Sequence, residues 1–186
     1  MLGIVGPPGA GKSTLATSLV AHLNASASFA AYVPMDGFHL ANAQLAALGL
    51  ASRKGHPSTF DVGGFVVALT RIRARAEVVY LPQYSRTLHE PLAAALAFDP
   101  SITLAIVEGN YLLLDEHPWT RVRPLLDEVW YLDASLETIR QRLVARQVLG
   151  GRTPAQAEAW VRESDLVNAR LIEATKPFAD RIIETS

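Results

Sequence analysis

The chain has 186 residues, 49% of them hydrophobic, and a formal net charge of −1 at pH 7. This size predicts one compact domain spanning residues 1–186. The near-neutral charge argues against nucleic acid as a partner, because such binding relies on Lys and Arg side chains that neutralise phosphates. The absence of cysteine excludes disulfides and thiolate chemistry and favours a cytoplasmic location, and no apolar stretch reaches the roughly 18 residues of a membrane span, so we expect no membrane partner.

Short apolar runs alternate with helical patterns along the chain. The runs have the composition of strands buried on both faces and cover Leu2 to Val5, Phe29 to Met35, Glu77 to Leu81, Ile102 to Val107 and Glu128 to Leu132. Helices are expected at Ser13 to Leu23, Val62 to Arg75, Leu136 to Leu149 and Pro154 to Ala174. This order predicts an α/β fold, a three-layer sandwich in which a mostly parallel sheet carries helices on both faces.

A glycine-rich loop, GPPGAGKST, follows the first of these strands. It fits the pattern G-x-x-x-x-G-K-[ST] and opens a helix, so that backbone N–H groups and the helix dipole are aimed at a phosphate. We expect Lys12 to reach the β- and γ-phosphates and Ser13 to offer its hydroxyl to Mg²⁺. The loop predicts a P-loop NTPase fold whose nucleotide-binding residues include Gly6, Gly9, Ala10, Gly11, Lys12, Ser13 and Thr14.

Two acidic residues stand where predicted strands end. Asp36 closes AAYVPMD and Glu108 closes ITLAIVE. Ligands of open α/β sheets bind outside the carboxyl ends of the strands, so both carboxylates are expected to face the terminal phosphates. There a carboxylate can hold Mg²⁺ or accept a proton from an attacking hydroxyl. The alternative is a capping or turn role, which is common for such residues before glycine.

Five further motifs carry a family resemblance. In chain order, MDGFH (35–39), RKGHPSTFD (53–61), YLPQYSR (80–86), VEGNYLLL (107–114) and EATKPFADRII (173–183) resemble the motifs of the uridine kinase, phosphoribulokinase and bacterial pantothenate kinase superfamily. The similarity runs from the P-loop almost to the C-terminus. MDGF and RKG-P-S-FD are nearest to the pantothenate kinase branch, and TKPFADRII is closer to the uridine kinase ending. EGNYLLLDE resembles a group of uncharacterised nucleoside or fructose kinase-like proteins.

The resemblance implies roles for individual residues. Asp36 matches the position that orients or deprotonates the acceptor hydroxyl, and Glu108 matches the Walker B position that holds the Mg²⁺ shell together with Ser13, although Asp is commoner there among P-loop proteins. The segments that line the acceptor pocket supply His39, His56, Asp61, Tyr84, Arg86 and Tyr111. Packing or hydrogen bonding within the fold is the alternative role for each of them.

Arginines gather behind the strand EVWYL. Arg142 and Arg146 are four residues apart on one helical face, and Gly150 and Gly151 then break the helix before Arg152. A basic helix followed by a flexible break predicts a mobile lid over approximately residues 140–155, with Arg142 and Arg152 on the nucleotide and Arg146 among the catalytic residues. Uridine kinases carry an Arg-bearing lid in the corresponding segment. A solvated charged face is the alternative.

Together these features predict an ATP- and Mg²⁺-dependent kinase that transfers the γ-phosphoryl group to a hydroxyl of a small metabolite. Its expected catalytic residues are Lys12, Asp36, Glu108 and Arg146. Phe178 stands where a guanine-binding motif would need Asp, which favours ATP over GTP. Pantothenate-like, nucleoside and sugar acceptors stay open. The alternatives are a nucleoside monophosphate kinase, for which Arg53, Lys54 and Arg86 offer cations, and an ATP-dependent regulatory switch. A homodimer is kept as one option for assembly.

Overall fold

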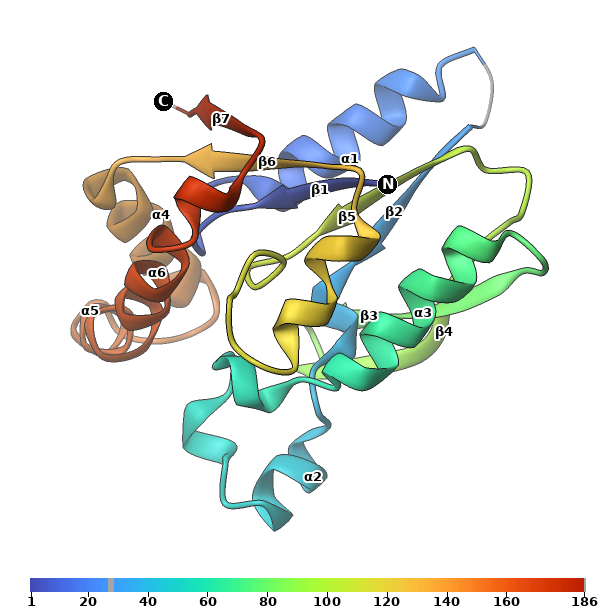
Figure 1. Cartoon of the computed structure of the whole chain (residues 1–186). Coiled ribbons are helices and arrows are strands. Elements are labelled where there is room, and N and C mark those ends of the chain that lie inside the picture. The colour runs from blue at the N-terminus through green and yellow to red at the C-terminus, as the bar shows by residue number, and fades with distance from the viewer. Residues whose placement is uncertain (27–28, 186) are drawn as a thin grey trace.

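A five-stranded parallel sheet forms the centre of the protein. The computed structural model describes residues 1–26 and 29–185. The strands lie in the order β2-β5-β1-β6-β7 (Figure 1). Their bounds are β1 (Leu2–Val5), β2 (Ala30–Pro34), β5 (Leu104–Glu108), β6 (Glu128–Asp133) and β7 (Arg181–Glu184). The sheet confirms the expected α/β class, and it includes β7, which the sequence patterns did not predict.

The helices begin at recognisable sequence signals. Ser135 accepts a hydrogen bond from the Thr138 backbone N–H, and Thr153 forms a capping box with Gln156, with Pro154 at the first helical position. The helices are α1 (Lys12–Leu23), α2 (Asn42–Ala47), α3 (Val62–Ala74), α4 (Leu136–Leu149), α5 (Pro154–Trp160) and α6 (Leu166–Glu173). Among the described residues, no helix is long and apolar enough to cross a membrane.

Side chains of the sheet alternate between two apolar layers. Ile106 points to the face covered by α1, where it packs in a cluster with the buried Ala16. Its neighbour Val107 points to the other face and packs in a cluster with Phe65 of α3 and Ile172 of α6. Both faces of the sheet are therefore covered by helices, which confirms the three-layer arrangement.

The prediction of a parallel-sheet strand at Glu77 to Leu81 is wrong. This segment belongs to β3 (Val79–Ser85), which pairs antiparallel with β4 (Glu90–Phe98) in a separate two-stranded sheet. Val79 and Leu81 are buried, whereas Tyr80 between them is 64% exposed. This alternation is typical of a sheet with one solvated face, and the short apolar run concealed it.

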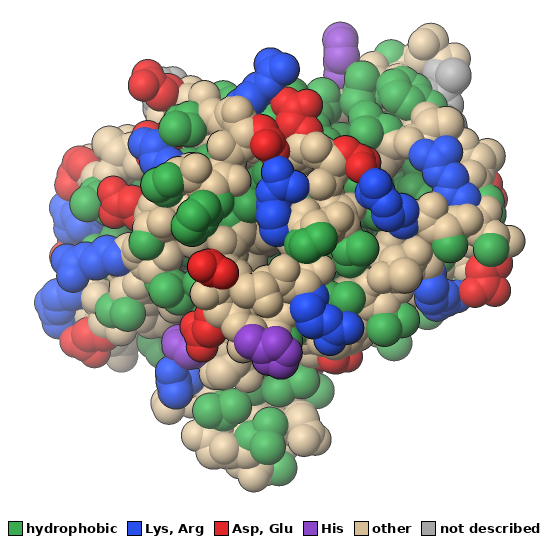
Figure 2. Space-filling view, viewed as in Figure 1, with side chains coloured by type: hydrophobic (Ala, Val, Ile, Leu, Met, Phe, Trp, Pro, Cys, Tyr) green, Lys and Arg blue, Asp and Glu red, His purple; other side chains and the backbone are tan. Residues whose placement is uncertain are grey.

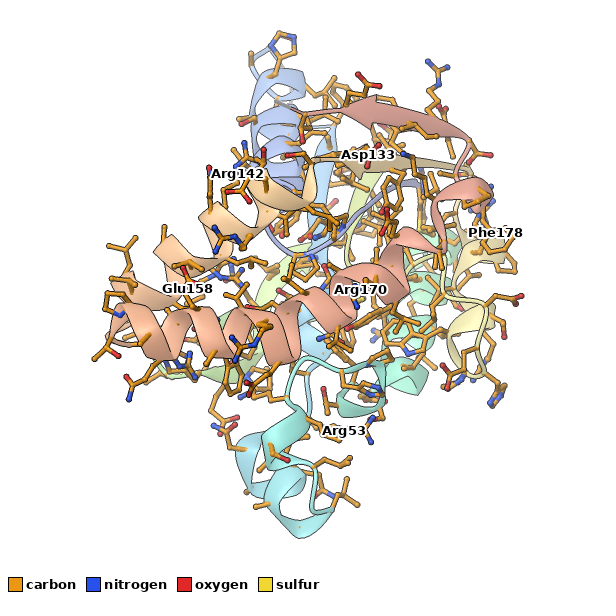
Figure 3. The ribbon with its side chains drawn as sticks, turned by 90° about the vertical axis from the view of Figure 1, so that its left-hand side faces the viewer. Arg53, Asp133, Arg142, Glu158, Arg170 and Phe178 are labelled. Carbon is orange, nitrogen blue, oxygen red and sulfur yellow. The ribbon has the colours of Figure 1, made fainter. Side chains whose placement is uncertain are left out.

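The long helix expected over Pro154 to Ala174 is interrupted. A π-helical turn, Val161–Asp165, separates α5 from α6, and the three segments follow one another as a single rod (Figure 3). One-turn π segments inside α-helices occur frequently at functional sites.

Parallel strand order brings the predicted ligand-binding residues to one edge of the sheet. Glu108 at the end of β5 is in register with Ile4 of β1 on one side and Pro34 of β2 on the other. The P-loop follows β1, and the 3₁₀ turn Met35–Phe38 follows β2. The loop, Glu108 and Asp36 therefore lie at neighbouring strand ends, as the sequence predicted.

Candidate active site

The P-loop passes over the neighbouring strand with little clearance. Gly6 has φ of 155°, and a Cβ atom at this position would lie 2.6 Å from the Leu132 carbonyl oxygen of β6. Only glycine avoids this backbone clash. The loop then turns through Gly9 and Gly11, both with positive φ, and Lys12 begins α1. The loop thus ends at the N-terminus of α1, and the first N–H groups of a helix can bind phosphate.

Lys12 is held inside the site by the loop itself. Its ammonium donates a 3.1 Å hydrogen bond to the Pro7 carbonyl and lies 4.0 Å from Oε1 of Glu108. Burial lowers the pKa of Lys12, and the negative charges of Glu108 and Asp36 oppose that shift. The lysine therefore lies between the loop and Glu108, and within electrostatic reach of Asp36.

Glu108 is the centre of a buried polar cluster. Its Oε2 accepts a 3.2 Å hydrogen bond from the Ser13 hydroxyl and a 2.8 Å hydrogen bond from the Tyr32 hydroxyl. Only 4% of Glu108 is exposed. Burial raises the pKa of its carboxyl, while Lys12 and the two hydroxyl donors stabilise the ionised form.

Tyr32 lies outside every motif of the sequence and was not among the predicted site residues. It lies on β2, the strand next to β5, and its pKa is raised by burial and by the charge of Glu108, so that the hydroxyl acts as a donor. Its position four residues before Asp36 on a predicted strand places it on the sheet, but 76 residues separate it from Glu108. No local pattern connects the two.

Asp36 occupies the 3₁₀ turn that links β2 to the acceptor-side segments. The turn fits tightly against β3, because a Cβ on Gly37 would lie 2.1 Å from the Pro82 carbonyl oxygen. The charge of Asp36 is felt at Glu108 and at Tyr111: burial raises the pKa of each of these groups, and Asp36 adds to the rise. The turn thus brings the charge of Asp36 within electrostatic reach of Lys12, Glu108 and Tyr111.

His39 lies beside Asp36 in an aromatic setting. Its Nδ1 is 2.8 Å from the Asp36 carbonyl oxygen, and its ring centroid is 4.0 Å from that of Phe60 and 4.9 Å from that of Tyr84. Burial lowers the pKa of His39, against the opposing effect of Asp36. The structure therefore brings together His39 and Tyr84, two of the predicted acceptor-pocket residues.

Three of the other four predicted acceptor-pocket residues, Asp61, His56 and Tyr111, have structural contacts of their own. Asp61 caps α3 by accepting a 2.8 Å hydrogen bond from Gly64 N, and His56 accepts one from Ser58 N. Tyr111 is fully buried, and its hydroxyl donates a 2.5 Å hydrogen bond to the Gly55 carbonyl. Arg86 is exposed in the turn between β3 and β4. For all six predicted acceptor-pocket residues, acceptor binding stays a prediction.

Lys54 joins two segments that flank this region. Its ammonium donates hydrogen bonds to Asn42 Oδ1 (2.5 Å) and to the His89 carbonyl (2.6 Å) and lies 5.3 Å from the Tyr84 ring centroid. From the sequence, Lys54 was expected only as a cation for a phosphorylated acceptor. The structure shows it bridging the α2 segment to the β3–β4 hairpin.

The predicted lid comprises most of α4, the Gly150–Gly151 turn and the start of α5. Arg142 donates a 3.3 Å hydrogen bond to the Gly9 carbonyl of the P-loop, and Figure 3 shows it on α4 above the α5–α6 rod. Arg152 donates to Gln147 and stacks 4.3 Å from the Trp160 ring centroid. Arg140 bridges to Glu158 of α5 at 3.3 Å. The lid helices are tied to each other and to the loop.

Charged side chains are interspersed rather than gathered on the face seen in Figure 2. Acidic and basic groups alternate over it, in keeping with the net charge of −1. This face therefore offers no continuous basic stripe of the kind that tracks a nucleic-acid backbone.

Comparisons with known proteins agree with this architecture. The chain is 36% identical over 180 residues to the uncharacterised protein YggC of Escherichia coli (strain K12), a match that covers 96% of this chain and 74% of that protein. It is 36% identical over 145 residues to the ATP-dependent kinase-like protein notR' of Aspergillus versicolor, covering 73% of this chain and 84% of that protein. No protein-family profile matches the chain.

Solved structures show the same relationship. A structure from Silicibacter sp. TM1040, whose name provisionally assigns it as a fructose transport system kinase, has a TM-score of 0.91 at 38% identity, covering 98% of this chain and 88% of that one. YFH7 of Saccharomyces cerevisiae shares the fold with a TM-score of 0.84 at 20% identity, covering 99% and 91%. The chain belongs to the P-loop kinases of the uridine kinase and phosphoribulokinase-like superfamily.

Proposed function

We propose that this protein transfers the γ-phosphoryl group of MgATP to a hydroxyl of a small metabolite. The observation that supports this most directly is the cluster at Glu108, in which a buried carboxylate meets the P-loop lysine Lys12 and the hydroxyl of Ser13. Such a cluster can bind phosphate and a metal ion at the same time. The lysine neutralises phosphate charge, and the hydroxyl and carboxylate oxygens can bind a cation.

The donor set of this cluster fits Mg²⁺. The ion prefers hard oxygen ligands and normally keeps several waters, so one or two protein groups suffice when phosphates complete its shell. Ser13 Oγ and Glu108 Oε2, which lie 3.2 Å apart, are the residues that would hold it. When bound, the ion supplies charge neutralisation on the phosphates.

Acceptor activation is assigned to Asp36. Its carboxylate would take the proton of the acceptor hydroxyl while that oxygen forms a bond to the γ-phosphorus and the bond to the β-phosphate oxygen breaks, releasing ADP. Its charge is felt at both Lys12 and Tyr111, which supports a place between the P-loop and the acceptor-side segments. Arg146, exposed on the lid helix, would approach the γ-phosphoryl from the opposite side.

The acceptor side is built from one 3₁₀ turn, one hairpin and the segment around Gly55. His39, whose pKa is lowered by burial, and Tyr84 present a polar aromatic wall, and Lys54 fixes the hairpin against the α2 segment. This wall suits a small polar molecule with hydroxyl groups. The name of the Silicibacter structure places fructose among the first acceptors to test.

A coupled assay of ADP release tests the proposal. Purified protein with MgATP is screened against fructose and other sugars, nucleosides, pantothenate, ribulose 5-phosphate and nucleoside monophosphates. We expect acceptor-dependent ADP release and a phosphorylated product visible by mass spectrometry, with ATP preferred over GTP. If only nucleoside monophosphates are phosphorylated, the hydroxyl-acceptor assignment is wrong. ATP hydrolysis that no acceptor stimulates would favour a regulatory ATPase instead.

A further inference from the structure

Lys54 differs from the other two lysines of the chain in its partners. Lys12 forms an ion pair with Glu108. Lys176 forms one with Asp133. Lys54 forms no ion pair with any residue that the structure describes, and its two hydrogen bonds go to neutral oxygens, a side-chain amide at 2.5 Å and a backbone carbonyl at 2.6 Å. An ammonium has three N–H donors, so the positive charge of Lys54 and one of its donors are left for another partner.

The carboxylate of the neighbouring hairpin is bound elsewhere. Both oxygens of Glu90 accept hydrogen bonds from the Asn42 backbone N–H, at 3.1 and 3.0 Å. Asn42 also donates from its side chain to the His89 carbonyl at 3.2 Å. The bridge between the α2 segment and the hairpin therefore uses Glu90 to bind a backbone N–H, and it uses Lys54 only against neutral oxygens.

Lys54 lies beside the acceptor side of the site. Its ammonium is 5.3 Å from the centroid of the Tyr84 ring, and that ring is 4.9 Å from the ring of His39. His39 Nδ1 is in turn 2.8 Å from the Asp36 carbonyl oxygen. Burial lowers the pKa of His39, and the charge of Lys54 lowers it further, in agreement with these distances. A series of contacts therefore runs from Lys54 through two rings to Asp36.

The series is partly open to solvent and has a closed apolar side. Its members Asp36, His39, Tyr84 and Lys54 are all half-buried. Phe60, whose ring centroid is 4.0 Å from that of His39, is buried. A small molecule from solution can therefore contact the polar members of the series.

The backbone next to Lys54 is fixed from the core. The carbonyl of Gly55 accepts a 2.5 Å hydrogen bond from the buried Tyr111 hydroxyl. The N–H of Gly55 donates a 3.1 Å hydrogen bond to Thr59 Oγ1. The position of the ammonium is thus largely set before a ligand binds, which lowers the entropic cost of binding.

We propose that Lys54 binds an anionic group of the acceptor, so that the substrate carries a carboxylate or a phosphate in addition to the hydroxyl that is phosphorylated. A lysine ammonium binds such groups as a point charge, and a half-buried charge is screened less by salt than an exposed one. His39 and Tyr84 would then lie along the middle of the acceptor, with Asp36 at its hydroxyl. This inference rests on the proposed function, since it names the substrate class of the same site. A sugar phosphate or a sugar acid fits the arrangement better than a neutral sugar.

Binding of matched probes in the presence of MgADP, measured by calorimetry, tests the inference without turnover. D-fructose is compared with D-fructose 6-phosphate, and D-glucose with D-gluconate, so that phosphate and carboxylate are distinguished. We expect one anionic member to bind about 10-fold more tightly than its neutral counterpart, the size of a hydrogen bond to a charged group. Absence of a preference for either anion would overturn the proposal.

Two variants separate anion binding from the bridging role of Lys54. Lys54→Met keeps the apolar stem beside Tyr84 and removes the charge, so it should abolish the preference for the anionic probe. Asn42→Ala is the matched control: it removes the same Lys54 hydrogen bond from the other side and leaves the ammonium, so the preference should stay within about twofold of the wild type. An unchanged preference in Lys54→Met, or equal losses in both variants, would overturn the proposal. If Lys54→Met unfolds, Lys54→Gln and the comparison of probes in the wild type provide the test.

Product analysis by mass spectrometry distinguishes this inference from the proposed function. If binding that depends on Lys54 appears but neither these probes nor the wider screen yields a phosphorylated product, the proposed function alone fails. If the new phosphoryl group is found on the anionic group rather than on a hydroxyl, Lys54 binds the accepting group itself and the inference is wrong.

Discussion

The hydroxyl of Tyr32 donates a 2.8 Å hydrogen bond to Oε2 of Glu108, across neighbouring strands of the sheet. This contact and the 3.2 Å bond from Ser13 converge on the same oxygen. The other oxygen faces Lys12. Each carboxylate oxygen therefore has its own partner, and the orientation of Glu108 is set before any nucleotide binds.

Tyr32→Phe is expected to loosen this orientation. The variant removes a donor from a buried charged acceptor, which typically costs about 1.5–3 kcal/mol in the free energy of unfolding. Chemical denaturation measures the loss, and a titration of Mg²⁺ dependence should show weaker binding with ATP present. Tyr80→Phe, at a tyrosine that is 64% exposed, is the control and should leave both unchanged. If Tyr32→Phe is as stable as the wild type, the hydrogen bond from Tyr32 to Glu108 makes no net contribution to the free energy of unfolding.

Asp36→Asn separates acceptor chemistry from nucleotide binding. Asn keeps the shape of the side chain but cannot take a proton, so kcat should fall about 10²–10⁴-fold, the usual contribution of a general base. ATP affinity should change little, whereas Lys12→Ala should weaken phosphate binding as well as turnover. Nucleotide titration measures the ATP affinity, and turnover with the acceptor found in the screen measures kcat. Loss of ATP binding with near-normal kcat at saturation would place Asp36 in the metal shell instead.

Gly37→Ala is expected to displace the 3₁₀ turn that carries Asp36. The new Cβ would lie 2.1 Å from the Pro82 carbonyl oxygen, a backbone atom that cannot move aside cheaply. We expect the free energy of unfolding to fall by about 1–3 kcal/mol, the usual range for overpacking, and kcat to fall as well. Gly63→Ala is the matched control: its Cβ would meet Asp61 Oδ1 at 3.6 Å, and alanine is favoured over glycine in helices. Thermal melts and turnover of both variants provide the comparison.

His39 should make stability depend on pH in mildly acidic solution. Burial lowers the pKa of His39 below the ordinary value of 6.5. The folded protein therefore binds this proton less readily than the unfolded chain, so the contribution to stability is present above pH 6.5 and is lost as pH falls through the folded-state pKa. His39→Asn should flatten this dependence in denaturation curves recorded from pH 8 to about pH 5. His22→Asn, on the exposed last turn of α1, is the control.

The lid remains a prediction that hydrogen exchange can check. Gly150 and Gly151 break the path from α4 to α5, and the contacts across the break run through Arg152 and its partners Gln147 and Trp160. We expect amides near residues 146–153 to exchange rapidly in the nucleotide-free protein and to become protected when ATP and acceptor are both bound. Slow exchange in the free protein would count against a lid.

Local signals fixed several elements because their causes lie within a few residues of the chain. The glycine spacing of the P-loop and the helix break at Gly150 and Gly151 were predicted from the sequence, since the positive φ angles of Gly9, Gly11 and Gly151 depend on the local residue type. The β3–β4 hairpin was not predicted: β4 contains LAAALA, whose alanines have little preference for strands. Pairing with β3 stabilises this segment as a strand, although its residues have little intrinsic preference for one.

By itself the sequence determined the superfamily, the α/β class and the P-loop, because short motifs at fixed spacing carry them. Only the tertiary structure decided which side chains complete the site. Tyr32 and Glu108 are 76 residues apart, and Lys54 meets the His89 carbonyl 35 residues away. Asp165 faces α4 because a π-helical turn holds it there. Such contacts follow from strand order and helix packing, which bring distant residues together and leave no periodic trace in the chain.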